Sequence, residues 1–311
     1  MTIEEGWENI RPNANSVLTV GTFDGVHLGH AAIIRFLNHI AAQEKGVSTV
    51  VTFDPHPREV LLGKPQGLLT DIKERSAYLA ALGLSRLVVV PFTKDFADTL
   101  PEPYIQKYLV ERIGLKVFVI GHDHRFGHNR MGGFGLLREK GTEFGFKTHE
   151  IPAQMVSDEV VSSTAIRHYL AKGQVDEAAT LLGRPYEVVG TVQSGQKLGR
   201  KLGFPTANVL PLHPRKILPM NGSYAVRITT DKGTRHEGMA YVGERPSVMP
   251  NGRRGLEVNI FDFKDNLYGQ PITVQFYTFI RHDERFPSLA LLQEALKKDQ
   301  ADCKAYFSAL S

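Results

Sequence analysis

Residues 20–30 read VGTFDGVHLGH and join an apolar run, SVLTVG, to an amphipathic stretch that begins at His30. The apolar run predicts a buried strand, and HAAIIRFLNHIAAQ predicts a helix. Gly21 lets the chain turn sharply after the strand and lets a ligand approach closely, and Gly25 and Gly29 also lack a Cβ. A strand followed by such a turn and a helix indicates a ligand site at the junction.

His27 and His30 are three residues apart, so on the first turn of a helix they project from roughly one face. A helix N-terminus offers unpaired backbone N–H groups and a partial positive charge, which together favour bound phosphate. The spacing therefore predicts a cradle for nucleotide phosphates. A metal-binding pair is less favoured because the motif holds no cysteine and no acidic third ligand. A plain tight turn is the other interpretation.

The first half of the chain alternates apolar runs with amphipathic stretches. Such alternation predicts an α/β, Rossmann-like domain with a parallel sheet and helices on both faces. The predicted strands are 17–21, 48–53, 86–92, 116–121 and 147–152.

From residue 186 the pattern changes to short strands separated by Gly, Pro and Asn, which is typical of a small antiparallel β-barrel. An amphipathic stretch at 288–310 predicts a C-terminal helix. The change of pattern predicts two domains, 1–184 and 185–311. The predicted strands of the second are 186–192, 223–230, 236–243, 256–263 and 272–280.

The composition is that of a soluble globular protein, with 311 residues, 42% hydrophobic and 23% charged. Cys303 is the only cysteine, which excludes an internal disulfide and a cysteine-based zinc site. The N-terminus, MTIEEGWENIRPN, has no apolar core, so we expect no signal peptide, a cytoplasmic location and no membrane partner. The net charge of +4 favours an ordinary basic surface over phosphate-bearing ligands or weak nucleic-acid affinity.

Three further segments carry candidate chemistry. Ser163, Thr164 and Arg167 open a predicted helix with hydroxyls and a cation, which suits either simple capping or a phosphate clamp. Residues 190–209 hold a glycine-rich basic loop, predicted to cover phosphates rather than bind RNA. The candidate phosphate ligands in this loop are Gly195, Gly199, Arg200 and Gly203.

Thr206 and Asn208 point to one side of an extended chain, so they can share one Mg²⁺ through oxygen ligands. Glu257 stands in an otherwise apolar strand, GLEVNIFDF at 255–263. A carboxylate there is explained either by a general base or by a salt-bridged glutamate on an edge strand. Phe276, Tyr277, Phe279 and Phe286 suit a ring-binding site and a barrel core equally well.

GTFDGVHLGH resembles the His-x-Gly-His motif of the nucleotidylyltransferase superfamily, and specifically its bacterial bifunctional riboflavin kinase/FMN adenylyltransferase branch. SSTAIR at 162–167 and GQKLGRKLGFPTAN at 195–208 are similar to that family's phosphate and flavokinase motifs. The resemblance runs from about residue 16 to the end of the chain, with transferase motifs before kinase motifs. His124 and Asn259 stand where the family more often has Phe and His.

The resemblance implies residue roles in two sites. It implies that Glu257 is the kinase base and that His27, His30 and Arg167 are catalytic in adenylyl transfer. In the first site it implies ATP contacts from Gly21, Phe23, Gly25, His27, His30, Ser163, Thr164 and Arg167, and flavin contacts from His56, Pro57, Asp123 and Arg125.

The resemblance also implies two ATP- and Mg²⁺-dependent reactions. Riboflavin is phosphorylated to FMN, and FMN is then adenylylated to FAD with release of pyrophosphate. Three alternatives stay open at this point: one inactive half, another phosphate-bearing acceptor in the first half, or a nucleotide- or RNA-binding regulator without turnover. We expect no nucleic-acid partner, and the sequence leaves the oligomeric state open.

Overall fold

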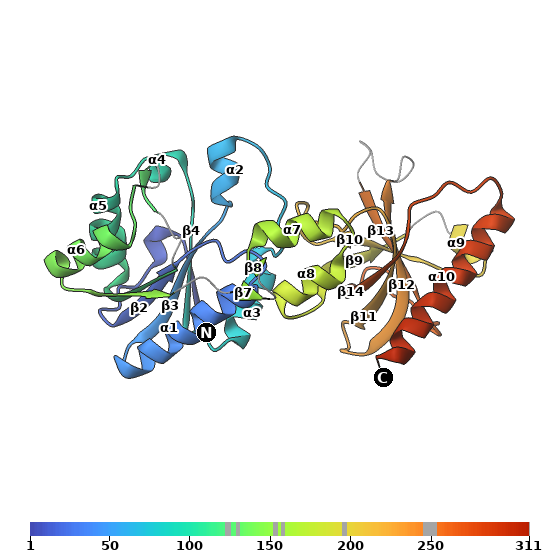
Figure 1. The fold of residues 1–311 in the computed structure, drawn as a ribbon, viewed down its shortest axis with the longest axis horizontal. Helices are drawn as coiled ribbons and strands as arrows, with labels where there is room; N and C mark the ends of the chain where they lie inside the picture. The colour runs from blue at the N-terminus through green and yellow to red at the C-terminus, as the bar shows by residue number, and fades with distance from the viewer. Residues whose placement is uncertain are drawn as a thin grey trace. The chain divides into compact units, whose positions relative to one another are not determined.

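The computed structural model describes residues 1–121, 126–128, 131–151, 155–156, 159–194, 198–244 and 254–310. The chain forms two compact units, Met1–Ser162 and Ser163–Ser311, which are described separately here (Figure 1). This division differs from the predicted domain boundary at 184/185, which follows the change of strand pattern. The boundary of the functional domains stays a prediction.

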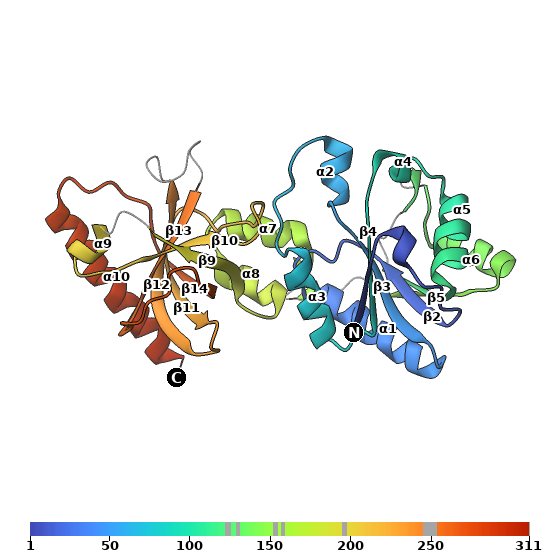
Figure 2. The same cartoon turned by 180° about the vertical axis from the view of Figure 1, so that it is seen from behind.

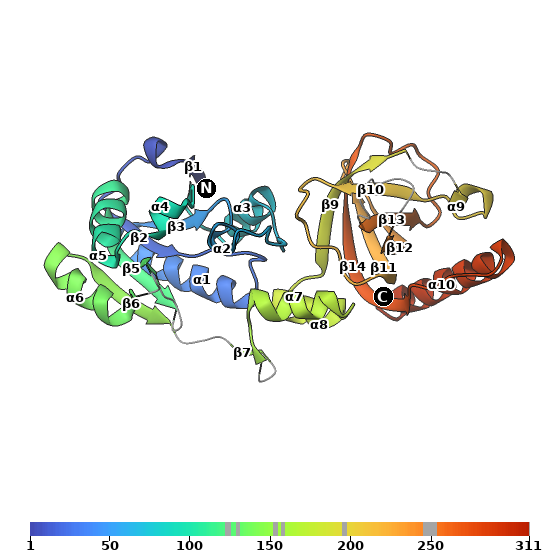
Figure 3. The same ribbon diagram turned by 90° about the horizontal axis from the view of Figure 1, so that it is seen from above.

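The first unit is a six-stranded, fully parallel sheet in the order β1-β4-β3-β2-β5-β6 (Figure 3). All five predicted strands are present within two residues of their predicted ends. The strands are β1 (Thr2–Glu5), β2 (Ser16–Val20), β3 (Val47–Phe53), β4 (Arg86–Val90), β5 (Leu115–Gly121) and β6 (Lys147–Ile151), and β7 (Met155–Val156) and β8 (Glu159–Val160) form a small separate ribbon.

The edge strand β1 was missed by the sequence analysis. Its four residues, TIEE, are mostly exposed, and among the described strands it pairs only with β4. A polar edge strand has no apolar run, so periodicity does not detect it.

The helices of the first unit follow the strands and lie on both sides of the sheet (Figure 3). They are η1 (Trp7–Asn9), α1 (Leu28–Gln43), α2 (Pro57–Leu62), α3 (Ile72–Ala81), α4 (Lys94–Ala97), α5 (Pro101–Pro103), the π-helical segment η2 (Tyr104–Ile113) and α6 (Phe134–Phe144).

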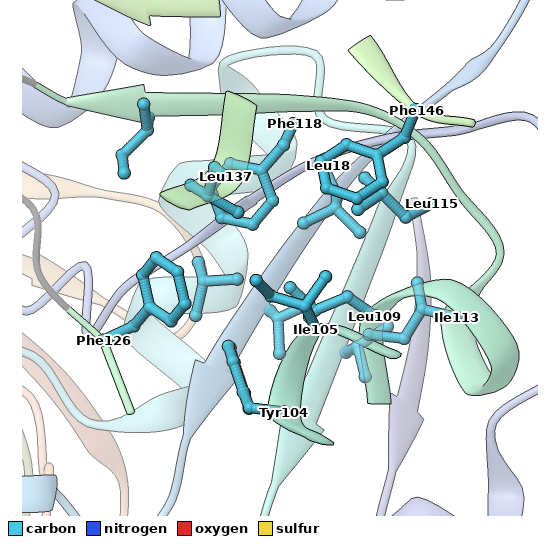
Figure 4. Packing of buried hydrophobic residues seen from close by; sticks show 14 of the residues in the cluster. Leu18, Tyr104, Ile105, Leu109, Ile113, Leu115, Phe118, Phe126, Leu137 and Phe146 are labelled. Atoms are coloured by element: carbon cyan, nitrogen blue, oxygen red, sulfur yellow. The ribbon is translucent and has the colours of Figure 1, made fainter. Parts of the chain in front are cut away.

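Alternate residues of the buried strands belong to two apolar clusters, one on each face of the sheet. Leu18 and Phe118 pack with Ile105 and Leu109 of η2 on one side of the sheet (Figure 4). Val17 packs with residues of α1 and α3 in the second cluster. Because both faces are covered, the central strands are rich in Val, Leu, Ile and Phe, as expected for a parallel sheet.

Strand β2 borders the point where the strand order reverses. From β2 the chain proceeds to β3 and β4 on one side, while β5 and β6 lie on the other. In open parallel sheets, ligands bind beyond the carboxyl ends of the strands at such a switch point. The segment VGTFDGVHLGH begins at the last residue of β2, so it lies at this position.

The second unit begins with α7 (Ser163–Ala171) and α8 (Val175–Leu182), followed by a closed antiparallel barrel (Figures 1 and 2). The barrel order is β10-β13-β12-β11-β14-β9, and α10 packs against β11, β12 and β14. Its elements are β9 (Tyr186–Gln193), α9 (Leu198–Lys201), β10 (Ala207–Pro211), β11 (Gly222–Thr230), β12 (Arg235–Glu244), β13 (Arg254–Ile260), β14 (Pro271–His282) and α10 (Leu289–Ala309).

The barrel and the C-terminal helix were predicted, but two details were wrong. Strand β10 was not among the predicted strands, because only Val209 of its five residues is buried. Strand β13 ends at Ile260 rather than at residue 263, because the chain turns at Asp262, where φ is +53°.

Candidate active sites

The loop between β2 and α1 has an unusual backbone. Phe23 and Val26 have φ of 48° and 40°, and Gly25 has φ of 87°. A left-handed conformation is unfavourable for a non-glycine residue and persists only where surrounding contacts fix it. The Gly21 turn brings the Phe23 ring so near that a Cβ at Gly21 would lie 3.0 Å from it.

The two histidines are together, as the spacing predicted. Their rings stack with centroids 3.6 Å apart and planes 16° apart, and the Phe23 ring lies 4.8 Å from that of His30. His27 is the N-cap of α1, and its Nδ1 accepts a hydrogen bond from the His30 backbone N–H at 3.3 Å. In the neutral ring the proton is therefore on Nε2, where it can be donated to a ligand oxygen.

Gly29 permits this arrangement. A Cβ at that position would lie 3.2 Å from the His27 ring and 3.5 Å from the carbonyl oxygen of Val161. His27 is 5% exposed. The packing thus holds a buried imidazole at the N-terminus of a 16-residue helix, where the helix dipole favours an anion.

Residues Ser163, Thr164 and Arg167 lie in the first turns of α7, at the start of the second compact unit. Arg167 Nη1 donates to the carbonyl oxygen of Ser163 at 3.2 Å, so its guanidinium group lies over the first turn of the helix. Thr164 is exposed. The role of this segment toward phosphate stays a prediction.

His56 and Pro57 lie at the start of α2, just after β3. The peptide bond between Asp54 and Pro55 is cis. His56 caps the helix, and its Nδ1 accepts from the Arg58 backbone N–H at 3.2 Å. Asp123 and Arg125, the other predicted flavin ligands, lie outside the described residues.

Aromatic side chains gather beyond the same ends of the strands. Phe53, the last residue of β3, makes an edge contact with Phe92 after β4, with ring centroids 5.3 Å apart. Both contact Phe96 in turn. Phe53 and Phe92 are half-buried, which leaves part of each ring accessible to a planar ligand. The sequence analysis did not single out these rings, because each reads as ordinary core.

A cavity of about 600 Å³ in the second unit brings the predicted kinase residues together. Thr206, Asn208 and Glu257 all line it, as does Gly199. Thr206 Oγ1 donates to Glu257 Oε2 at 2.9 Å, and Asn208 is directly opposite Glu257 in the β10–β13 ladder. Three side chains with oxygen ligands thus share one wall, as expected for a site that holds Mg²⁺ together with a phosphate.

The loop before β10 is held against β13 by a second contact. Asn259 is 5% exposed, lines the cavity, and donates its amide N–H to the carbonyl oxygen of Pro205 at 2.7 Å. A Cβ at Gly199 would lie 2.3 Å from the carbonyl oxygen of Phe204, so only glycine permits this approach of α9. Of the other loop residues, Gly203 has φ of 85°, Arg200 is exposed, and Gly195 lies outside the described residues.

Apolar side chains also line the cavity. Phe286 and Leu292 lie there, and Leu289 at the start of α10 is 59% exposed. Of the four aromatics whose role the sequence left open, Phe286 lines the cavity and Phe276 is fully buried in the barrel. The cavity therefore combines apolar side chains with the hydroxyl, amide and carboxylate groups of Thr206, Asn208 and Glu257.

A buried ion pair at the edge of this cavity was not predicted. Asp299 of α10 is 2% exposed and accepts from Arg281 Nε at 2.8 Å and from Ser223 Oγ at 3.0 Å. All three residues line the cavity. Asp299 lies 18 residues after Arg281 and 76 residues after Ser223, and the three residues lie on three different elements, so sequence spacing does not reveal the pair.

Two architectures define the class of protein: a His-x-Gly-His loop at the switch point of a parallel sheet, and a barrel with a Thr-x-Asn and glutamate wall. Together these two architectures are typical of an ATP-dependent transferase with two active domains. Residues 9–165 match the family model for FAD synthetase, and residues 182–307 match the model for riboflavin kinase. The chain belongs to the family of bifunctional riboflavin kinases/FMN adenylyltransferases.

Relatives of that name resemble the chain over nearly its whole length. The protein from Haemophilus influenzae is 38% identical over 96% of this chain and 97% of its own. The protein from Escherichia coli K12 is 36% identical over 95% and 94%. A solved structure described as a macrolide-efflux protein from Streptococcus pneumoniae has a TM-score of 0.86 at 29% identity, covering 97% and 98%. Among the described residues of this chain, no helix has the length and apolar composition needed to cross a membrane.

Proposed function

We propose that this chain carries out the two reactions of its family in two separate sites. The barrel cavity phosphorylates riboflavin with ATP, and the site at the end of β2 adenylylates FMN with a second ATP. The observation that carries the proposal is the contact of Thr206 Oγ1 with Glu257 Oε2 at 2.9 Å, in a cavity that apolar side chains also line. Such a cavity suits a ligand with a flat apolar ring and a polyhydroxyl chain.

In the kinase step, the 5′-hydroxyl oxygen of riboflavin attacks the γ-phosphorus of ATP. The new O–P bond forms as the bond to the ADP oxygen breaks, and the hydroxyl proton passes to Glu257. Thr206 and Asn208 would hold Mg²⁺, whose oxygen preference their side chains satisfy. When bound, this ion neutralises phosphate charge. The protein's part is mainly positioning and charge stabilisation.

In the adenylyl transfer step, a phosphate oxygen of FMN attacks the α-phosphorus of ATP. The bond between the α-phosphorus and the bridging oxygen breaks, and pyrophosphate leaves. FMN phosphate is already ionised at neutral pH, so this step needs no protein base. His27 and His30 donate hydrogen bonds to phosphate oxygens and stabilise the charge of the transition state. Ser163, Thr164 and Arg167 hold the leaving group.

Two groups of residues are proposed to bind the flavin of FMN during adenylyl transfer. His56 and Pro57, together with Asp123 and Arg125, are the residues proposed to contact it. The half-buried rings of Phe53 and Phe92 supply an aromatic surface beyond the strand ends, against which an isoalloxazine ring can stack.

Separate assays of the two reactions test the proposal. His30→Ala should lose FAD formation from supplied FMN and keep FMN formation from riboflavin. Glu257→Gln should show the opposite pattern, with FMN formation reduced by a factor of about 10² to 10⁴. Loss of both activities in either variant, at unchanged stability, would contradict the assignment of one reaction to each site. If wild-type protein with riboflavin, ATP and Mg²⁺ yields no FMN, the proposed function is wrong.

A further inference from the structure

Asp24 is fully buried and lies in the middle of the loop between β2 and α1. No role in catalysis or binding follows for it from the sequence pattern. Its Oδ1 accepts from the Thr70 backbone N–H at 2.8 Å and from Thr70 Oγ1 at 3.2 Å, and its Oδ2 accepts from the Leu69 N–H at 3.2 Å. A single carboxylate thus binds the loop to the segment before α3, some 45 residues away.

Thr70 also accepts a hydrogen bond from the loop. The backbone N–H of Gly25 donates to Thr70 Oγ1 at 2.9 Å, so the hydroxyl accepts from Gly25 and donates to the preceding residue, Asp24. This ring of hydrogen bonds encloses the left-handed Gly25, with φ of 87°, and is flanked by Phe23 and Val26.

A buried arginine extends the network to the sheet. Arg75 is 3% exposed, and one of its nitrogens lies 4.0 Å from Asp24 Oδ1. Its Nη1 donates to Thr52 Oγ1 at 3.2 Å, and Thr52 Oγ1 donates to the carbonyl oxygen of Thr22 at 3.1 Å. The residues on both sides of Phe23 are therefore fixed by side chains from β3 and α3.

Left-handed φ values at non-glycine residues cost of order 1–3 kcal/mol each and persist where their surroundings over-determine them. Phe23 and Val26 both have such values, and the Phe23 ring lies against His30. A relaxed loop would move that ring and the His27 cap together. The network therefore fixes the position from which the two imidazoles approach a ligand.

We propose that Asp24 is a positioning residue for adenylyl transfer, which holds the strained turn that places Phe23, His27 and His30. The inference rests on the proposed phosphate role of the two histidines. It predicts that loss of the Asp24 contacts reduces the rate of the chemical step more than the affinity for substrates.

The test uses Asp24→Asn in the full-length protein. Since all three hydrogen bonds to Asp24 require an acceptor, an amide group would direct N–H groups at one of the donors. We expect kcat for FAD formation to fall about a hundredfold, as for a displacement of about 1 Å of catalytic groups, with the KM for FMN and for ATP within about threefold. FMN formation from riboflavin should be unchanged.

Asp71→Asn is the matched control. Asp71 is one residue from Thr70 and also nearly buried, but its carboxylate caps α3 through Glu74 and does not touch the loop. This variant should keep kcat for FAD formation within about twofold. If Asp24→Asn lowers the melting temperature as Asp71→Asn does, yet keeps wild-type kcat, Asp24 is merely structural and the inference is overturned.

Two milder variants at Thr70 test the same inference in case Asp24→Asn does not fold. Thr70→Ser keeps the hydroxyl that bridges Gly25 and Asp24, and should keep kcat. Thr70→Val removes it, and should lower kcat for FAD formation at least tenfold. Equal rates for the two variants would overturn the inference. His30→Ala distinguishes failure of the Asp24 inference from failure of the proposed function. If His30→Ala still forms FAD, the proposed role of His30 in adenylyl transfer is wrong.

Discussion

Thr206 Oγ1, just before β10, donates a hydrogen bond to Glu257 Oε2 of β13 at 2.9 Å. Because the hydroxyl proton is directed at the carboxylate, the lone pairs of Thr206 Oγ1 remain available for a cation. One contact therefore orients both the proposed Mg²⁺ ligand and the proposed base. Asn208, opposite Glu257 in the ladder, completes the same wall.

FMN formation should require the hydroxyl group of Thr206 but not its methyl group. We expect Thr206→Ser to keep most of the activity and Thr206→Val to lower kcat about a hundredfold, in the range of a lost electrostatic ligand. The Mg²⁺ concentration for half-maximal FMN formation should rise in Thr206→Val. A Mg²⁺ titration of riboflavin phosphorylation measures both effects.

FAD formation from supplied FMN is the internal control for the Thr206 variants, since that reaction is assigned to the first unit. It should stay unchanged. Equal Mg²⁺ dependence in Thr206→Ser and Thr206→Val would remove Thr206 from the metal site.

The pairs of residues in the two candidate sites could be predicted from the sequence because each pair is close together along the chain. His27 and His30 are three residues apart, and Thr206 and Asn208 are two apart, so regular backbone geometry alone brings each pair together. The alternation of apolar strands and helices likewise predicted the sheet. The contacts that fix these pairs in place are not local: Asp24 meets Thr70 across 46 residues.

Long-range pairs were missed because no periodic signal marks them. Asp24 reads as a turn residue between Phe and Gly, and Asp299 reads as one of several charges on an amphipathic helix. Only the fold shows that both carboxylates are buried and accept several hydrogen bonds.

Gly29→Ala should impair FAD formation through the His27 ring. The added Cβ would lie 3.2 Å from that ring and 3.5 Å from the Val161 carbonyl oxygen, so the ring must shift by a few tenths of an ångström. We expect about a tenfold fall in kcat for FAD formation, because small displacements of catalytic groups are costly. FMN formation should not change.

Gly135→Ala is the control for this change. Gly135 is also helical, in α6, and its Cβ would meet nothing within 4 Å. Alanine favours helix over glycine by about 1 kcal/mol, so this variant should be as stable as wild type or more stable. Should both variants form FAD at the wild-type rate, close packing at Gly29 would have no catalytic consequence.

The Asp299–Arg281 pair should stabilise the barrel and the wall of the flavin cavity. Asp299→Ala would leave the Arg281 guanidinium group without its carboxylate in a largely buried position, and we expect a loss of about 3–5 kcal/mol of unfolding free energy. Urea denaturation followed by fluorescence measures this loss. The KM for riboflavin should rise as well, because both residues line the cavity.

Glu294→Ala, an exposed substitution on the same helix, is the comparison for Asp299→Ala. It should change stability by less than about 0.5 kcal/mol, as surface substitutions do. A similar stability in the two variants would show that the buried pair contributes no more than an exposed charge.

Cys303 makes stability depend on pH in the alkaline range. Burial, together with the charges of Asp299 and Asp302, raises the pKa of its thiol to about 12, above the ordinary value of 9.0. The folded state therefore keeps its proton where the unfolded state loses it. Stability should be unaffected by this group below about pH 9 and should fall by about 1 kcal/mol per pH unit between pH 9 and 12.

The difference in unfolding free energy between wild type and Cys303→Ala isolates this thiol from lysine and tyrosine titration. That difference should be constant below pH 9 and shrink at higher pH, because only the wild type carries the thiol. As Cys303 is the only cysteine and fully buried, a thiol reagent at pH 8 should label it slowly in native protein and at once in urea. Rapid labelling of native protein, or a difference independent of pH up to 11, would show that the thiol is accessible and ionises normally.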